Sequence, residues 1–241
     1  MGFFDALFGG SPEKQFQKHR KRMKHKDTQQ EDRIASIHWL AEDGSPEAIY
    51  ALLGRFEMTY EHHMKDNQEK VLAEELVLNL GDAALSALLK FIPKTKQFAR
   101  PLALYEQIAG REKCLDLVLD MLEMEKERSE LKAEKKRHVL IKLAEFKDPR
   151  IEPAVLGELS TFDEGVRYAA AEVLAAQEPS DSIRDALLDR LDHADEDSNR
   201  LRVRIAEIAH SRGWSLAHRA ESIAANPPAN WSVVGDRLRQ G

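Results

Sequence analysis

The sequence of 241 residues contains a single cysteine, Cys114, so it can form neither an internal disulfide nor a zinc site built from several cysteines. It is also poor in helix-breaking residues, with 12 glycines and 9 prolines. No run of alternating Val, Ile or Thr lies between turn residues, so strand signals are almost absent. The abundance of Ala, Leu, Glu and Lys instead favours helices, in which Cys114 is expected to fill space.

Long apolar runs are also missing. No stretch of 18 consecutive apolar residues occurs, so no segment is expected to span a bilayer. The apolar opening, residues 1–9, precedes the basic segment, which is the reverse of the order in a secretory signal. We therefore expect a cytoplasmic protein.

The charge is unevenly distributed along the chain. The net charge is -6, but residues 1–28 carry seven Lys and Arg against three Asp and Glu, which leaves +4 there and -10 in the remainder. An acidic body is a poor match for phosphates, so nucleic acid is an unlikely partner by this criterion. The basic arm, in contrast, suits any anionic surface.

The most informative pattern is a repeated nine-residue stretch. The sequence RYAAAEVLA (167–175) matches RVRIAEIAH (202–210) at an offset of 35 residues, with the same Arg, Ala and Glu. Weaker copies begin at Arg33, Lys70, Pro101 and Arg137. Because each copy has helical spacing, each is expected to form the first helix of a repeating unit.

A break and a second amphipathic segment follow most copies. The breaks contain Gly or Pro, which end one helix and begin the next. Helix pairs that recur every 30 to 37 residues cannot each enclose a core, so they are expected to stack. The sequence thus predicts an all-α fold, a right-handed α-α superhelix of about six helix pairs over residues 29–224. We expect alanines 169–171 to line its seams, and Arg167 to pair locally with Asp163.

The best repeat also carries a family resemblance. DEGVRYAAAEVL (163–174), followed by a turn containing Pro179 and by SIRDALLDRL (182–191), resembles HEAT repeats of the short type found in the phycobilisome-lyase-like group. Proteins of this type are mostly interaction scaffolds. The resemblance therefore implies a non-enzymatic scaffold or adaptor for an unidentified protein. The alternatives are a phycobilin-lyase-like enzyme and a DNA-binding HEAT-like repeat protein.

Residues that could perform chemistry are not grouped in the sequence. It has no His-Glu dipeptide of the kind repeated in di-iron hydroxylases of similar architecture. The adjacent His62 and His63 would point about 100° apart on a helix, which makes a poor chelate. His62 with Asp66, or His38 with Glu42, has better spacing but no evident third ligand. We expect no catalytic residue, no metal and no cofactor.

The first 28 residues are the main element outside the repeats. Phe3 and Leu7, like Phe4 and Phe8, are four residues apart, which predicts a short helix with an apolar face before Gly9-Gly10. Such a face followed by basic residues is typical of a membrane-surface anchor. The alternatives are a cap on the first repeat and a protein-binding peptide. The expected cationic contacts with the membrane are Lys18, Arg20, Lys21 and Arg22.

The tail, residues 225–241, is expected to cap the last repeat, because terminal repeats expose apolar surface. It contains Trp231, and a peptide hook for another protein is the alternative. Trp39 occupies an apolar repeat position and is expected in the core, while Trp214 begins the last second helix.

The second helices are expected to line an inner, protein-binding face. The charged residues expected to be exposed on that face are Arg55, Lys90, Arg150, Arg184 and Arg190. The charged run 123–137 is expected either to prolong the neighbouring helices or to project as an insertion.

Overall fold

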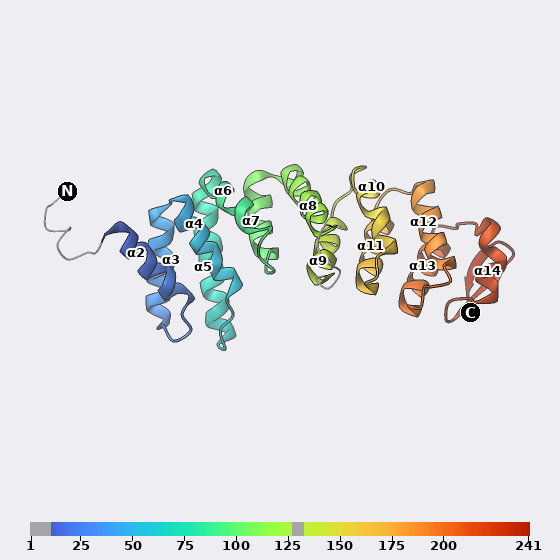
Figure 1. Cartoon of the computed structure of the whole chain (residues 1–241), viewed down its shortest axis with the longest axis horizontal. Coiled ribbons are helices and arrows are strands. Elements are labelled where there is room, and N and C mark those ends of the chain that lie inside the picture. The colour runs from blue at the N-terminus through green and yellow to red at the C-terminus, as the bar shows by residue number, and fades with distance from the viewer. Residues whose placement is uncertain (1–10, 127–132) are drawn as a thin grey trace. The chain divides into compact units, whose positions relative to one another are not determined.

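The computed structural model describes residues 11–126 and 133–241 (Figure 1). Helices dominate these residues, which confirms the all-α class. Phe3, Phe4, Leu7 and Phe8, and the middle of the charged run 123–137, lie outside the described residues. The chain divides into two compact units, Met1–Leu117 and Val118–Gly241.

The first unit alternates longer and shorter helices. Its elements are α2 (Pro12–Lys24), α3 (Gln30–Asp43), α4 (Pro46–Leu53), the 3-10 turn η1 (Gly54–Glu57), α5 (His63–Leu80), η2 (Gly81–Ala84), α6 (Leu85–Phe91) and α7 (Ala99–Ala109). Helix α8 (Arg111–Lys126) begins in this unit and ends in the next. The first helices of successive pairs contact each other, α3 with α5 and α5 with α7, and α4 contacts α6.

The second unit repeats this pattern. Its elements are α9 (Ala133–Leu143), α10 (Ile151–Val155), η4 (Leu156–Ser160), α11 (Glu164–Ala176), α12 (Asp181–Asp192), α13 (Asn199–Ser211), η5 (Ala217–Arg219), α14 (Ala220–Ala225), and the strands β1 (Trp231–Val234) and β2 (Arg237–Gln240). Helix α11 packs between α9 and α13, and α12 contacts α14. Successive first helices are again neighbours.

Helix ends lie where the sequence places its breaks. Gly44 takes the left-handed conformation, with φ 64°, and ends α3. The Ser45 hydroxyl then accepts a hydrogen bond from the Ala48 N–H at 3.2 Å, and Pro46 begins α4. Ser180 caps α12 in the same way through the Ile183 N–H, at 3.0 Å. These caps satisfy backbone donors that have no partner within the helix.

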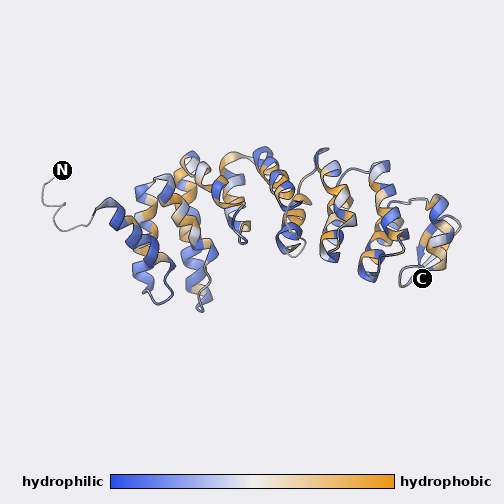
Figure 2. Ribbon diagram, viewed as in Figure 1, coloured by the Kyte–Doolittle hydropathy of each residue, from blue (hydrophilic) through white to orange (hydrophobic). Residues whose placement is uncertain are grey.

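The alanines of α11 are buried within the second unit. Ala169, Ala170 and Ala171 expose at most 5% of their surface, and α11 contacts α9 and α13. Small side chains let helix backbones approach closely, so they suit a helix that has neighbours on both sides. Figure 2 shows the apolar residues, in orange, along the sides of helices that face one another.

Residues 12–24 belong to the first unit and do not form a separate basic segment. Helix α2 packs on α3, α4 and η1, and Met23 is fully buried. The Tyr60 hydroxyl donates a hydrogen bond to the Met23 carbonyl at 2.7 Å. The His19 ring stacks on Trp39 with centroids 4.6 Å apart, which leaves Trp39 half-buried beneath α2 instead of in the core. Helix α2 therefore caps the first helix pair.

The tail contains the only β-strands among the described residues. Strands β1 and β2 form an antiparallel hairpin in which Val234 pairs with Arg237 across Gly235 and Asp236. The expectation of no strands is wrong here, because Gly235 adopts φ 65° and permits a two-residue hairpin turn. Trp231 is buried, β1 contacts α14 and β2 contacts α13, so the hairpin packs against the last helices.

Candidate functional surfaces

A buried ionic cluster joins the first two helix pairs. Arg33 of α3 donates two hydrogen bonds through Nε and one through Nη2 to the Glu69 carboxylate in α5, at 2.8–3.1 Å. Arg55 of η1 donates to the same carboxylate at 3.0 Å and to Asp66 Oδ1 at 2.5 Å. Both guanidinium groups lie over the Tyr60 ring, at 4.3 and 4.5 Å from its centroid. Every charge in this group is paired.

Electrostatics fix the ionised state of this cluster. Burial alone raises the pKa of Asp66, but hydrogen bonds from Lys70 and Arg55 outweigh it and hold the pKa below its ordinary value. The hydrogen bond to Glu69 raises the pKa of Arg33 despite burial. Burial raises the pKa of Tyr60 against the two nearby cations. The cluster therefore offers ion pairs and no poised acid or base.

A second cluster has the same design in the second unit. Arg167 of α11 donates through Nε and Nη2 to Glu196, at 2.8 and 2.9 Å. Arg190 of α12 places its Nε 2.7 Å from Glu196 Oε2. Burial alone raises the pKa of Glu196, but hydrogen bonds from Arg167 and the Ser198 N–H, with the charge of Arg190, lower it. The expected local pair of Arg167 with Asp163 is wrong, because the Asp163 side chain caps the Val166 N–H.

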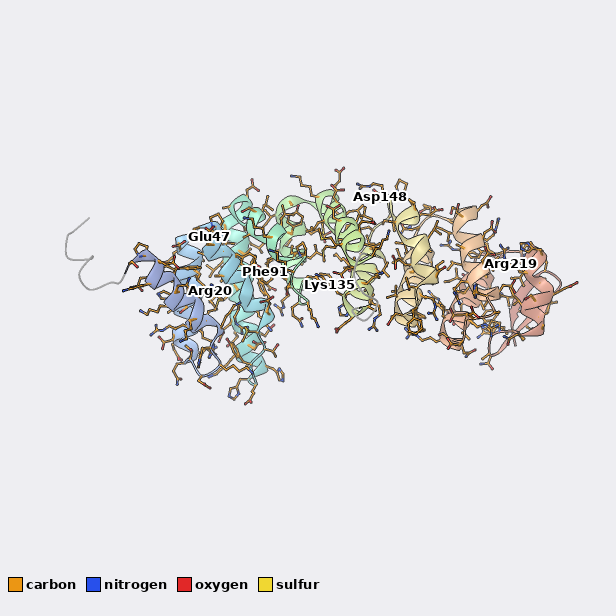
Figure 3. All side chains as sticks on the ribbon, viewed as in Figure 1. Arg20, Glu47, Phe91, Lys135, Asp148 and Arg219 are labelled. Atoms are coloured by element: carbon orange, nitrogen blue, oxygen red, sulfur yellow. The ribbon has the colours of Figure 1, made fainter. Side chains whose placement is uncertain are left out.

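The two clusters have the same arrangement of two arginines around one glutamate. In each, the two helices of a pair supply one arginine each, and both meet a buried glutamate of the segment that follows. Each first arginine also donates to a carbonyl just before its own helix: Arg33 to Thr28, and Arg167 to Thr161 and Phe162. A related contact joins α12 to η5, where Arg219 Nη2 lies 2.6 Å from Asp189 (Figure 3). These charges hold successive helix pairs in register.

The predicted protein-binding cations are mostly neutralised. Arg55 is fully buried and the Arg190 side chain is only 10% exposed, so both are wrong as exposed residues, because each serves an internal glutamate. Arg150 lies 2.8 Å from Asp148, and Arg184 lies 2.8 Å from Asp181. Within the described residues, Lys90 is exposed and has no ion pair.

Helix α2 presents the least neutralised cationic surface. Phe16, His19 and Met23 face α3 and α4, while Lys14, Lys18 and Lys21 lie on the opposite side, within about 60° of one another at 100° per residue. The predicted membrane contacts differ in whether they form an ion pair. Arg22 pairs with Asp32 at 3.2 Å, whereas Lys18, Arg20 (Figure 3) and Lys21 are exposed with no ion pair to any described residue. Burial, then the charges of Lys18 and Arg22, lowers the pKa of His19.

The candidate metal ligands do not converge. His62 and His63 are exposed, and Asp66 is occupied by Arg55 and Lys70, so Asp66 is not available to join His62 as a ligand. Across residues 11–126 and 133–241, no group of three or more His, Cys, Asp or Glu side chains could hold a metal. Cys114 is fully buried.

One aromatic side chain is unusually exposed. Phe162, in the turn between η4 and α11, is 84% exposed, while its carbonyl accepts a hydrogen bond from Arg167 Nη1 at 2.7 Å. Since Arg167 is held by Glu196, the backbone that carries the ring is anchored. No sequence pattern indicated this position.

A groove lies between the C-terminal hairpin and the end of α13. It has a volume of about 500 Å³, and all four residues of β2 line it together with Ala209, His210, Gly213 and Trp214. Trp214 also lies near the guanidinium of Arg212, 5.4 Å from its ring centroid. This groove was not predicted from the sequence. Its signal was Gly235-Asp236 between the alternating residues of WSVV and RLRQ.

Comparisons with known proteins add no relative. No protein-family model matches the chain, and no curated protein matches it. In the described part of the chain, no helix is both long and apolar enough to cross a membrane.

Proposed function

We propose that the chain is a non-enzymatic helical-repeat adaptor that binds another protein, and that its helix pairs form a right-handed superhelix of the HEAT type. The supporting observation is the repeated Arg–Glu–Arg cluster that joins one helix pair to the next segment. Neighbouring first helices contact each other in each unit, as a stack of repeats requires.

The buried clusters also favour a scaffold over an enzyme. The strongest concentrations of ionisable groups, around Glu69 and Glu196, are enclosed and mutually paired. They have no exposed acid, base or nucleophile to present to a substrate. Buried ion pairs of this kind set geometry more than they add stability. A scaffold needs such fixed spacing between the surfaces that it presents.

Phe162 is the contact that we propose for the partner protein. Exposed aromatic side chains on an ordered backbone often dominate binding, because little entropy is lost when they are buried. We expect Phe162→Ser to weaken binding by about 30-fold, the equivalent of about 2 kcal/mol. Ile141→Ser, which alters another exposed apolar residue of the same unit, is the matched control and should retain wild-type affinity.

Site-specific photo-crosslinking in the native host identifies the protein to be titrated. A photoreactive phenylalanine at position 162 should yield a discrete adduct that position 141 does not yield. The partner is then purified, and its affinity for wild type, Phe162→Ser and Ile141→Ser is measured by calorimetry. Identical adducts at both positions, or an unchanged affinity of Phe162→Ser, would contradict this contact.

A second proposed property is recruitment to an anionic membrane surface, with the protein otherwise cytoplasmic. The lysine row of α2 (Lys14, Lys18 and Lys21) is about 10 Å long and lies opposite the face that packs on α3. Since that apolar face is already occupied, α2 contributes attraction to head groups and no insertion. Each lysine near an anionic leaflet contributes about 1 kcal/mol. Any apolar insertion by Phe3, Phe4, Leu7 or Phe8 would add to this.

Charge reversal tests the membrane contact without removing α2. Truncation before α3 would expose the surface that Met23 covers, so point substitutions are more informative. Replacing the lysine row of α2 with glutamates should lower the apparent affinity for phosphatidylserine vesicles, measured by sedimentation, by about 100-fold or more. The control carries the same charge change at three exposed lysines outside α2, Lys94, Lys96 and Lys113. Equal losses in both variants would reject a specific role for α2.

The two competing functions make different predictions. A phycobilin-lyase-like protein should shift the visible spectrum of a bound tetrapyrrole, and an unchanged spectrum at saturating pigment would end that proposal. A DNA-binding repeat protein should bind duplex DNA through α2 with a strong salt dependence. Equal DNA binding by wild type and the charge-reversed α2 variant would exclude that mode.

A further inference from the structure

No third strand pairs with the outer edge of β2 in the described residues. In the hairpin, the Gly241 N–H donates to the Asn230 carbonyl at 2.9 Å, whereas the Trp231 N–H donates to the Pro228 carbonyl and not to Gln240. Antiparallel pairs alternate between hydrogen-bonded and non-hydrogen-bonded positions. Arg239 and Arg237 therefore direct their backbone groups toward β1, and Leu238 and Gln240 direct theirs away from it.

A side chain of α13 confirms this direction. His210 Nδ1 lies 3.0 Å from the Leu238 carbonyl oxygen, which therefore points toward α13. A carbonyl can only accept, so Nδ1 is the donor. Leu238 is only 2% exposed and its outward backbone groups face α13, so the N–H and the carbonyl of Gln240 remain at the open edge. Exposed edges of this kind are templates for pairing with another strand.

The groove beside this edge has one sign of charge. Arg237 and Arg239 are its charged residues, and none of its eight lining residues is acidic. Gly213, which lines the same groove, has φ 63°, a conformation that favours glycine. Trp214 supplies an aromatic surface on the same side.

We infer that this groove accepts an extended acidic segment of a partner protein, which adds to β2 as a third strand. Its backbone would pair with Gln240, and its carboxylates would face Arg237 and Arg239. Main-chain pairing gives affinity in such additions, and the flanking side chains give specificity. The inference rests on the proposed adaptor function, because it names a class of segment that the adaptor binds.

Charge separates this occupant from a second copy of the chain. Pairing β2 with β2 of another copy would bring Arg237 and Arg239 close to their own counterparts. Like charges on adjacent strands are destabilising, whereas opposite charges are favourable. An acidic strand therefore fits this edge better than self-association does.

A substitution at the open edge tests strand addition directly. Gln240→Pro removes the N–H that the added strand needs, but that N–H takes no part in the hairpin. Gln240→Val keeps the N–H and suits a strand, so it is the matched control. Binding of a fluorescein-labelled Glu-Val-Glu-Val-Glu-Val peptide to the full-length protein is followed by fluorescence anisotropy. A Lys-Val peptide of equal length tests the choice of charge.

We expect the acidic peptide to bind wild type and Gln240→Val with equal affinity. It should bind Gln240→Pro at least about tenfold more weakly, because that variant loses one edge hydrogen bond and adds a steric conflict. The lysine peptide should not bind. The urea midpoint of each variant verifies that the hairpin is intact. Equal binding by Gln240→Pro, or no binding of the acidic peptide to wild type, overturns the inference. The adaptor proposal is tested separately by the Phe162 adduct, so either can fail alone.

Discussion

At the scale of single residues, the sequence predicts where the buried arginines lie in the repeat, but not which carboxylates they pair with. The repeat alignment places Arg33 and Arg167 at corresponding positions. Their carboxylate partners, however, lie 36 and 29 residues further on, in different local settings. A local rule favours the nearest carboxylate, but Asp163 is already used as a helix cap. Competition between capping and ion pairing decides such cases, and it depends on the folded geometry.

The same geometry predicts a large cost for removing one glutamate. Glu196→Gln keeps the side-chain volume but leaves the buried Arg167 and Arg190 without a counter-charge. Breaking a buried pair in this way costs about 3–5 kcal/mol. We expect the urea transition of the second unit to shift by that amount. Fluorescence in a Trp39→Phe background reports it, since Trp214 and Trp231 both lie in that unit.

Asp197→Asn is the control for this experiment, because it changes the same charge at the next residue. The Asp197 side chain is 94% exposed and lies 3.9 Å from Arg167. Exposed pairs contribute about 1 kcal/mol or less. If both variants shift the transition equally, the buried cluster does not hold α11 and α12 as described.

At the scale of elements, helix limits were predictable because their signals are local. Gly44, Ser45 and Pro46 end one helix and begin the next within three residues, as expected. The hairpin was missed although Gly235-Asp236 is a turn signal, because its strands are four residues long and the rest of the chain reads as helix. Its open edge also depends on which backbone groups face β1, which the sequence does not encode locally.

Helix α2 likewise has some features that its own sequence predicts and others that depend on residues distant in the sequence. It begins at Pro12 after the Ser11 cap, and its basic composition was readable from the sequence. Its packing was not, because Phe16 and Met23 alone do not make an apolar stripe. His19 completes the buried face by stacking on Trp39. His19, although polar, thus becomes part of the packing face, because the fold places the Trp39 ring beside it.

At the scale of the whole molecule, each unit contains a buried, ion-paired carboxylate, and the first unit also contains the half-buried His19. The pKa values of Asp66 and Glu196 are lowered from ordinary values of 3.8 and 4.5. Folding therefore favours their ionised forms, and the stability that they contribute is present above those values and lost as pH falls through the folded pKa. The pKa of His19 is lowered from 6.5, so folding favours its neutral form. Its contribution is lost as pH falls below 6.5.

The two units should consequently respond to acid in sequence. Between pH 7.5 and about 5.5, loss of the His19 contribution should destabilise the first unit, and loss of the Glu196 and Asp66 contributions should follow below about pH 4.5 and 3.8. The first unit is followed by the reaction of Cys114, the only cysteine, with a pyridyl disulfide in urea, and the second by fluorescence in the Trp39→Phe background. His19→Gln should abolish the early loss in the first unit, since glutamine does not titrate. An early loss in the first unit that persists in His19→Gln would show that His19 is not the titrating group.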